Sequence, residues 1–113
     1  MLVESGFPRQ ATSRSYYAAF YAARAALEAA GISPPKTHSG LRTRFSEFAR
    51  ATPGIGGEVG RALSQLETGR TDADYGEPTI SVAEAKDAIE KAEHIVDVVE
   101  RAIAAELGSG PPQ

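Results

Sequence analysis

The stretch that decides the fold is residues 13–27, SRSYYAAFYAARAAL. Alanine is the best helix former because it loses no side-chain entropy, so this alanine-rich run predicts a helix. Its large side chains divide by spacing into two stripes. The first stripe consists of Tyr16, Phe20, Ala23 and Leu27, and the second consists of Tyr17, Tyr21 and Arg24. We expect the first stripe to pack in a core and the second to face a groove or a partner.

The composition indicates one ordinary globular domain. The chain has 113 residues, of which 42% are hydrophobic and 24% charged, which is typical of a water-soluble fold. There is no cysteine, so disulfides and thiolate metal sites are excluded. No apolar run approaches the roughly 18 residues of a membrane span. We therefore expect a cytoplasmic protein without metal or cofactor, with its domain over residues 1–107 and a disordered tail over 108–113.

The charge is divided unevenly along the chain. Residues 1–71 carry a net charge of +4, whereas residues 72–113 carry −7. The two halves could complement each other across a bundle or between subunits. Alternatively, the front half offers a basic face to an anionic ligand such as RNA or a nucleotide.

Helical periodicity and turn signals predict four helices. The first runs from Pro8 to about Ala30, because proline suits a first helical turn and Gly31 can end the helix. The second covers 39–51, after a connector stiffened by two prolines and with Thr37 or Ser39 as its cap. The third begins near residue 58, and the fourth follows the capping box SVAE at 81–84. No segment alternates with period two, so we expect an all-α, antiparallel up-and-down four-helix bundle.

Neither histidine has the spacing of a zinc site. His94 lies among charged residues of the fourth helix, which is typical of a solvated surface position. His38 follows Lys36 at the mouth of the second helix, where amide groups favour anions. It is therefore either a residue of the connector or, together with Lys36, a phosphate contact.

The apolar line of the third helix is broken by an arginine. Val59, Leu63 and Leu66 are followed on the same line by Arg70, and Asp74 lies four residues further on, within reach of an ion pair. One interpretation is a structural arginine that Asp74 satisfies. The other makes Arg70 a group that clamps phosphate or stabilises a transition state, with Tyr75 as a hydrogen-bond donor.

Three segments together resemble the HEPN domains, in particular a branch of small stand-alone bacterial and archaeal proteins. They are the tyrosine-rich helix (13–27), the segment PKTHSGL (35–41) and the segment RTDADY (70–75), which precedes the capping box. The resemblance covers about residues 3–105. It implies an all-α bundle that often dimerises and acts beside minimal nucleotidyltransferases in toxin–antitoxin or defence loci. Members usually have more helix before the segment at 6–8, so either this start is truncated or the bundle has lost that stretch and exposes an apolar face. Dimerisation through the first helix would cover such a face.

Many HEPN proteins are metal-independent RNases with an arginine followed four to six residues later by a histidine. Here no arginine precedes His38 or His94 at that spacing, and the matching place holds Arg70 followed by Tyr75. An ordinary tyrosine, with a pKa of about 10, is a poor base at neutral pH, whereas histidine titrates there. The substitution thus favours binding over catalysis.

We therefore predict a HEPN-type homodimer that binds RNA or a nucleotide, or engages a nucleotidyltransferase. Two alternatives stay open: an RNase toxin that uses Arg70 with Tyr75 or His38, and a purely structural dimerisation adaptor. The candidate ligand-binding residues are Arg14, Tyr17, Arg24, Lys36, His38, Arg70, Asp74 and Tyr75.

Overall fold

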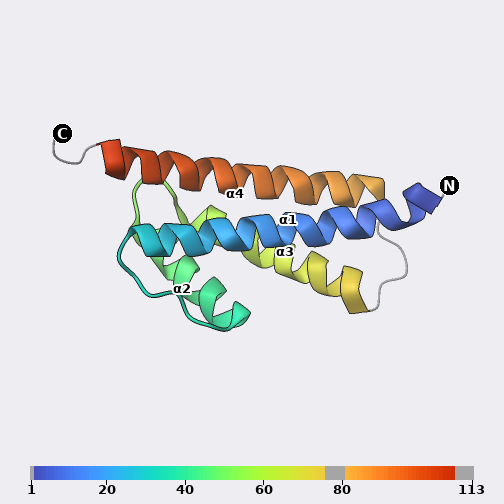
Figure 1. The fold of residues 1–113 in the computed structure, drawn as a ribbon, viewed down its shortest axis with the longest axis horizontal. Helices are drawn as coiled ribbons and strands as arrows, with labels where there is room; N and C mark the ends of the chain where they lie inside the picture. The colour runs from blue at the N-terminus through green and yellow to red at the C-terminus, as the bar shows by residue number, and fades with distance from the viewer. Residues whose placement is uncertain (1, 76–80, 109–113) are drawn as a thin grey trace.

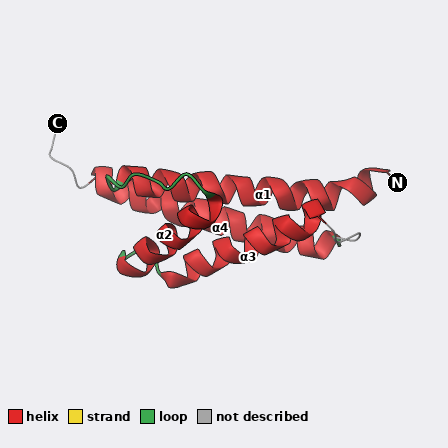
Figure 2. Cartoon of the chain, turned by 90° about the horizontal axis from the view of Figure 1, so that it is seen from below, coloured by secondary structure: helices red, strands yellow, loops and turns green. Residues whose placement is uncertain are grey.

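The computed structural model describes residues 2–75 and 81–108, with side chains over 8–68 and 81–105. These residues form four helices and no strand (Figures 1 and 2), which confirms the all-α prediction. The helices are α1 (Leu2–Ala29), α2 (His38–Ala51), α3 (Gly57–Tyr75) and α4 (Val82–Gly108). None of these described helices is long and apolar enough to cross a membrane. Gly108, the first residue of the predicted tail at 108–113, is the last residue of α4, and residues 109–113 lie outside the described residues.

The helix directions differ from a strict up-and-down order. Helices α1 and α4 run parallel, with Ala18 beside Val96 and, further along, Ala26 beside Ala102. Only α3 runs in the opposite direction (Figure 1). The cause is the connector between α1 and α2, whose prolines at 34 and 35 disfavour a tight turn. It runs back along α1, so α2 starts beside the middle of α1 and follows the direction of α1 (Figure 2).

The predicted core stripe of α1 is confirmed. Tyr16, Ala23 and Leu27 are fully buried and Phe20 nearly so, whereas Tyr17 and Tyr21 are exposed. The predicted start at Pro8 is wrong, because the helix begins at Leu2 and contains the proline. A proline this near a helix end forfeits one early hydrogen bond and does not have to stop the helix.

The ends of α1 and α2 follow the expected signals. Gly31 has a φ of +80° after the last turn of α1, where the Ile32 amide donates to the Leu27 carbonyl. Thr37 caps α2, because its Oγ1 accepts a hydrogen bond from the Gly40 amide at 3.0 Å. Helix α2 thus begins one residue before the predicted start.

Helix α4 has the predicted capping box but a shifted core line. Ser81 Oγ accepts from the Glu84 amide at 3.0 Å, and the Ser81 amide donates to Glu84 Oε1 at 2.8 Å. Alternating steps of three and four residues predict a core line of Val82, Ala85, Ile89, Ala92, Val96, Val99 and Ile103. In the structure Val82 is exposed, and Ile89 and Val96 are only half-buried. The buried line instead consists of Ala85, Ala88, Ala92, Ile95 and Val99. Helix α4 packs against both α1 and α3, which a stripe of this width allows.

Candidate functional site

His38, the first residue of α2, lies against the middle of α1. Its Nδ1 is 2.8 Å from the hydroxyl oxygen of Tyr16. Its ring stacks on Phe20, with the ring centres 4.2 Å apart and the planes at 21°. The ring of Tyr17 meets it edge-on at 6.0 Å. We call Tyr16, Tyr17, Phe20 and His38 the aromatic cluster.

The aromatic cluster has a buried half and an open half. Tyr16 and Phe20 belong to the core, whereas His38 is half-buried and Tyr17 is 37% exposed. The hydrogen bond between the Tyr16 hydroxyl and Nδ1 fixes the orientation of the imidazole ring. The cluster therefore joins a fixed imidazole to an accessible aromatic face.

The connector and the polar stripe of α1 supply cations around the cluster. Lys36 is exposed two residues before His38. Arg24 is exposed and lies about two helical turns beyond Tyr17. It forms an ion pair with Glu28 at 3.6 Å. Exposed pairs of this kind contribute little to stability, so Arg24 remains available to an anion.

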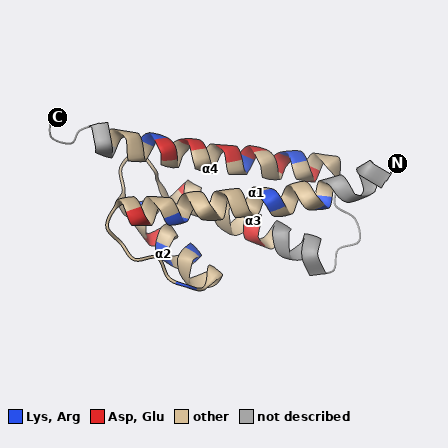
Figure 3. Ribbon diagram, viewed as in Figure 1, with Lys and Arg blue, Asp and Glu red and all other residues tan. Residues whose placement is uncertain are grey.

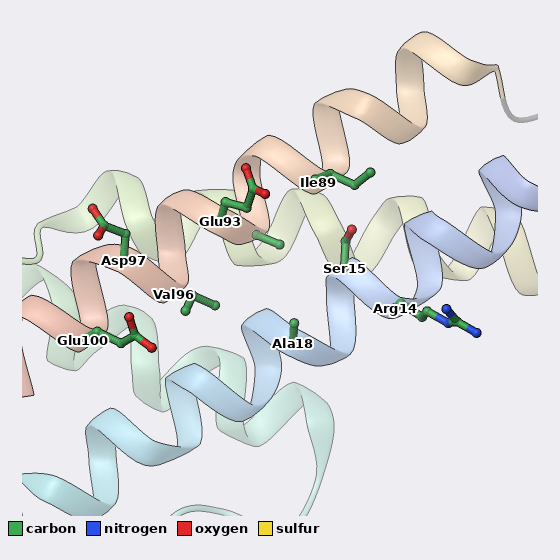
Figure 4. A pocket seen from close by; sticks show the side chains of 9 residues that line it. Arg14, Ser15, Ala18, Ile89, Glu93, Val96, Asp97 and Glu100 are labelled. Atoms are coloured by element: carbon green, nitrogen blue, oxygen red, sulfur yellow. The ribbon is translucent and has the colours of Figure 1, made fainter.

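Arg14 lies on another side of α1, at a groove between α1 and α4 (Figure 4). The groove holds about 400 Å³ and is mainly apolar, with three carboxylates along its α4 wall. Its lining consists of Arg14, Ser15, Ala18, Ile89, Ala92, Glu93, Val96, Asp97 and Glu100. The structure thus places Arg14 apart from His38, with Arg14 at the α4 side of α1 and His38 at the α2 side.

Three predicted site residues sit on the last two turns of α3. The backbone of Arg70, Asp74 and Tyr75 is helical, but their side chains lie outside the described residues. Because α3 runs against α1, its end lies along the first half of α1 (Figure 1). Whether Arg70 is a structural arginine that Asp74 satisfies or a group that clamps phosphate stays a prediction.

The described charges pair mostly within helices. Arg44 pairs with Glu47, Arg101 with Asp97 and Lys91 with Asp87. Between helices, His94 Nε2 lies 3.5 Å from Glu58 Oε1, and both side chains are exposed. Acidic residues outnumber basic ones on α4, and basic residues outnumber acidic ones on α2 (Figure 3), so the charge division of the sequence becomes a difference between helices.

The contact between Tyr16 and His38 was missed by the sequence interpretation. Tyr16 was assigned to the core stripe, and a buried phenol needs a hydrogen-bond partner. The sequence therefore indicated that the Tyr16 hydroxyl needs a hydrogen-bond partner. Many polar residues could have been that partner, so the sequence did not single out His38. No group of three or more possible metal ligands occurs among the described residues.

The chain belongs to the HEPN domain family, whose sequence model matches residues 1–102. It is 35% identical to a UPF0332 protein of Thermotoga maritima over 91% of this chain and 78% of the relative. It is 31% identical, over 91% of this chain and 76% of the relative, to a Methanocaldococcus jannaschii protein named "Putative toxin". A UPF0332 protein of Gloeobacter violaceus is 44% identical over 57% of this chain and 50% of its own length. No solved structure matches the chain.

Proposed function

We propose that this protein is the HEPN module of a toxin–antitoxin or defence system and that it binds RNA as a homodimer. The observation that carries the proposal is the aromatic cluster, with His38 fixed by Tyr16 next to the exposed ring of Tyr17. The relative named as a toxin supports the toxin-related role. Such a role belongs in the cytoplasm, beside a minimal nucleotidyltransferase as the protein partner.

The open half of the cluster suits a single-stranded nucleic acid. Base stacking on aromatic rings tolerates any sequence, and Tyr17 presents such a ring. Lys36 and Arg24 provide the nearby cations, and the imidazole of His38 provides a directed hydrogen bond. In this proposal Arg70 and Tyr75 of α3 complete the phosphate contacts, with Asp74 orienting Arg70.

Binding in a salt series tests this proposal. Wild type should bind a short single-stranded RNA with an affinity that falls as salt rises, because cations release counterions from phosphates. His38→Ala and Tyr17→Ala should each weaken binding about tenfold, the cost of one lost stacking or hydrogen-bond contact. His94→Ala is the matched control, because this exposed histidine lies on α4. The absence of RNA binding by the wild type at low salt would overturn the proposal.

Cleavage of RNA is the second candidate, and the hydrogen bond between Tyr16 and His38 is the observation behind it. A general base needs one ring nitrogen free to accept a proton, so this role requires the tautomer in which Nδ1 donates to the Tyr16 oxygen and Nε2 is unprotonated. Arg70 would stabilise the charge that develops on the phosphate. Growth arrest on expression that both His38→Ala and Arg70→Ala relieve would support this activity. Tolerated expression together with intact RNA would count against it.

A dimer that serves structure alone gives a different result. In that case Arg70→Ala should lower the unfolding temperature or dissociate the dimer, and RNA binding should be absent at every salt concentration. A pull-down with the neighbouring nucleotidyltransferase then separates an adaptor from an RNA-binding module.

A further inference from the structure

The contact between α2 and α3 carries an unusual concentration of arginines. Arg42 and Arg50 of α2 line a hollow of about 230 Å³, opposite Ser64 of α3. The rest of its lining is Thr43, Ser46 and Glu47. The hollow thus combines two guanidinium groups with three hydroxyl groups contributed by two helices. We call this hollow the arginine seam.

A third arginine adjoins the seam at the start of α3. Gly57 has no side chain, and the stem of Arg50 passes over it, so that a methyl group there would lie 3.0 Å from Arg50 Cγ. The same methyl position is 3.7 Å from Arg61 Nη1. Arg50 and Arg61 therefore converge on the amino end of a 19-residue helix, where the helix dipole adds positive potential.

Arg42, Arg50 and Arg61 lack the carboxylate partners that three other arginines of the described chain have. Arg24, Arg44 and Arg101 each have a carboxylate within 4 Å. Within the described residues, no carboxylate lies that close to Arg42, Arg50 or Arg61. In addition, the Nε atom of Arg42 is buried and has no hydrogen-bond partner. Glu47, the one carboxylate of the seam, is already engaged with Arg44 at 3.8 Å.

We propose that the arginine seam is a binding site for a phosphate group, separate from the aromatic cluster. Guanidinium groups form paired hydrogen bonds with phosphate oxygens, and the hydroxyls of Thr43, Ser46 and Ser64 can donate further ones. A buried donor without an acceptor is costly, and a phosphate at the seam relieves that cost once the Arg42 side chain adjusts. The phosphate can be free, as inorganic phosphate or a mononucleotide, or it can belong to the backbone of an RNA.

Titration of the full chain tests the site. Inorganic phosphate, AMP and a short single-stranded RNA are added at constant ionic strength, and backbone amide shifts in NMR spectra report the binding. We expect shifts centred on Ser46 and Ser64, and a loss of affinity of about tenfold or more in Arg42→Gln and Arg50→Gln, the scale for one lost charged hydrogen bond. Arg101→Gln, which removes the same charge from an exposed position of α4, should change the affinity less than about twofold.

The three ligands distinguish the source of the phosphate. Binding of phosphate or AMP at the seam indicates a free phosphate, and binding of RNA alone indicates a backbone contact; either result supports the site. Unfolding temperatures in the absence of ligand show that the variants are folded. The proposal is overturned if none of the three ligands shifts Ser46 or Ser64, or if Arg42→Gln and Arg50→Gln both bind as wild type does. If His38→Ala no longer binds RNA but inorganic phosphate still shifts the amides of Ser46 and Ser64, the arginine seam and the aromatic cluster are separate sites.

Discussion

Tyr16 shows how one buried polar atom connects the core to the candidate site. Its ring is fully buried among α1, α2 and the core, and its hydroxyl reaches His38. A buried hydroxyl group requires such a partner, because desolvation without a hydrogen bond costs free energy. The same contact therefore stabilises the fold and orients the imidazole.

Replacing that hydroxyl should be measurable in the stability of the protein. Tyr16→Phe keeps the ring and removes the hydrogen bond to His38, so we expect a loss of about 1 kcal/mol in the free energy of unfolding. Urea denaturation followed by circular dichroism measures it. Tyr21→Phe is the control, because Tyr21 is 59% exposed, and it should leave the midpoint unchanged. Equal midpoints for Tyr16→Phe and wild type would contradict the structural role of the contact.

Gly60 allows α2 and α3 to approach closely. A methyl group there would lie 2.7 Å from Ser46 Oγ and 3.0 Å from Ser46 Cα, which is backbone and cannot rotate away. We expect Gly60→Ala to destabilise the protein by about 1–3 kcal/mol despite the better helix propensity of alanine. Gln65→Ala, at an exposed position of the same helix, should stay within about 0.5 kcal/mol of wild type. A more stable Gly60→Ala variant would show that the helices are not held at this distance.

At the scale of elements, the helices begin and end where local chemistry directs them. The capping box of α4 and the Thr37 cap of α2 both form the hydrogen bonds that the sequence predicts. These signals are local, since each involves residues three positions apart. The beginning of α1 was mispredicted because a proline permits a helix start but does not require one.

The capping box should contribute measurably to the stability of α4. Ser81→Ala removes the acceptor for the Glu84 amide, and we expect a loss of about 1 kcal/mol, observed as a lower thermal midpoint. Ser33→Ala in the exposed connector is the matched control and should have no effect. Equal thermal midpoints for Ser81→Ala and Ser33→Ala would show that the stability of α4 does not depend on its cap.

At the scale of the whole molecule, the parallel arrangement of α1 and α4 creates the groove that Arg14 borders. One wall carries Arg14 and the other carries Glu93, Asp97 and Glu100, above an apolar floor (Figure 4). A surface with opposite charges on its two walls can pair with a second copy of itself turned about a two-fold axis. This groove is therefore where we expect the proposed homodimer to form.

A negative charge on the α1 side of the groove should disrupt that dimer. Ala18→Glu places a carboxylate on α1, opposite the three carboxylates of α4, so we expect dissociation to monomers in sedimentation velocity. Ala83→Glu, at an exposed position outside the groove lining, should leave the dimer intact. If Ala18→Glu remains a dimer, the dimer interface lies outside this groove.

The sequence by itself determined the all-α class, the four helices, most of the α1 and α3 cores and the caps, because these depend on composition and on spacings of three or four residues. Only the tertiary structure decided the parallel direction of α1 and α4, the hydrogen bond of Tyr16 with His38, and the placement of Arg14 away from that histidine. The arginine seam likewise depends on the packing of α3 against α2. These features depend on how a connector routes one helix relative to another, and no spacing within a single helix encodes that relation.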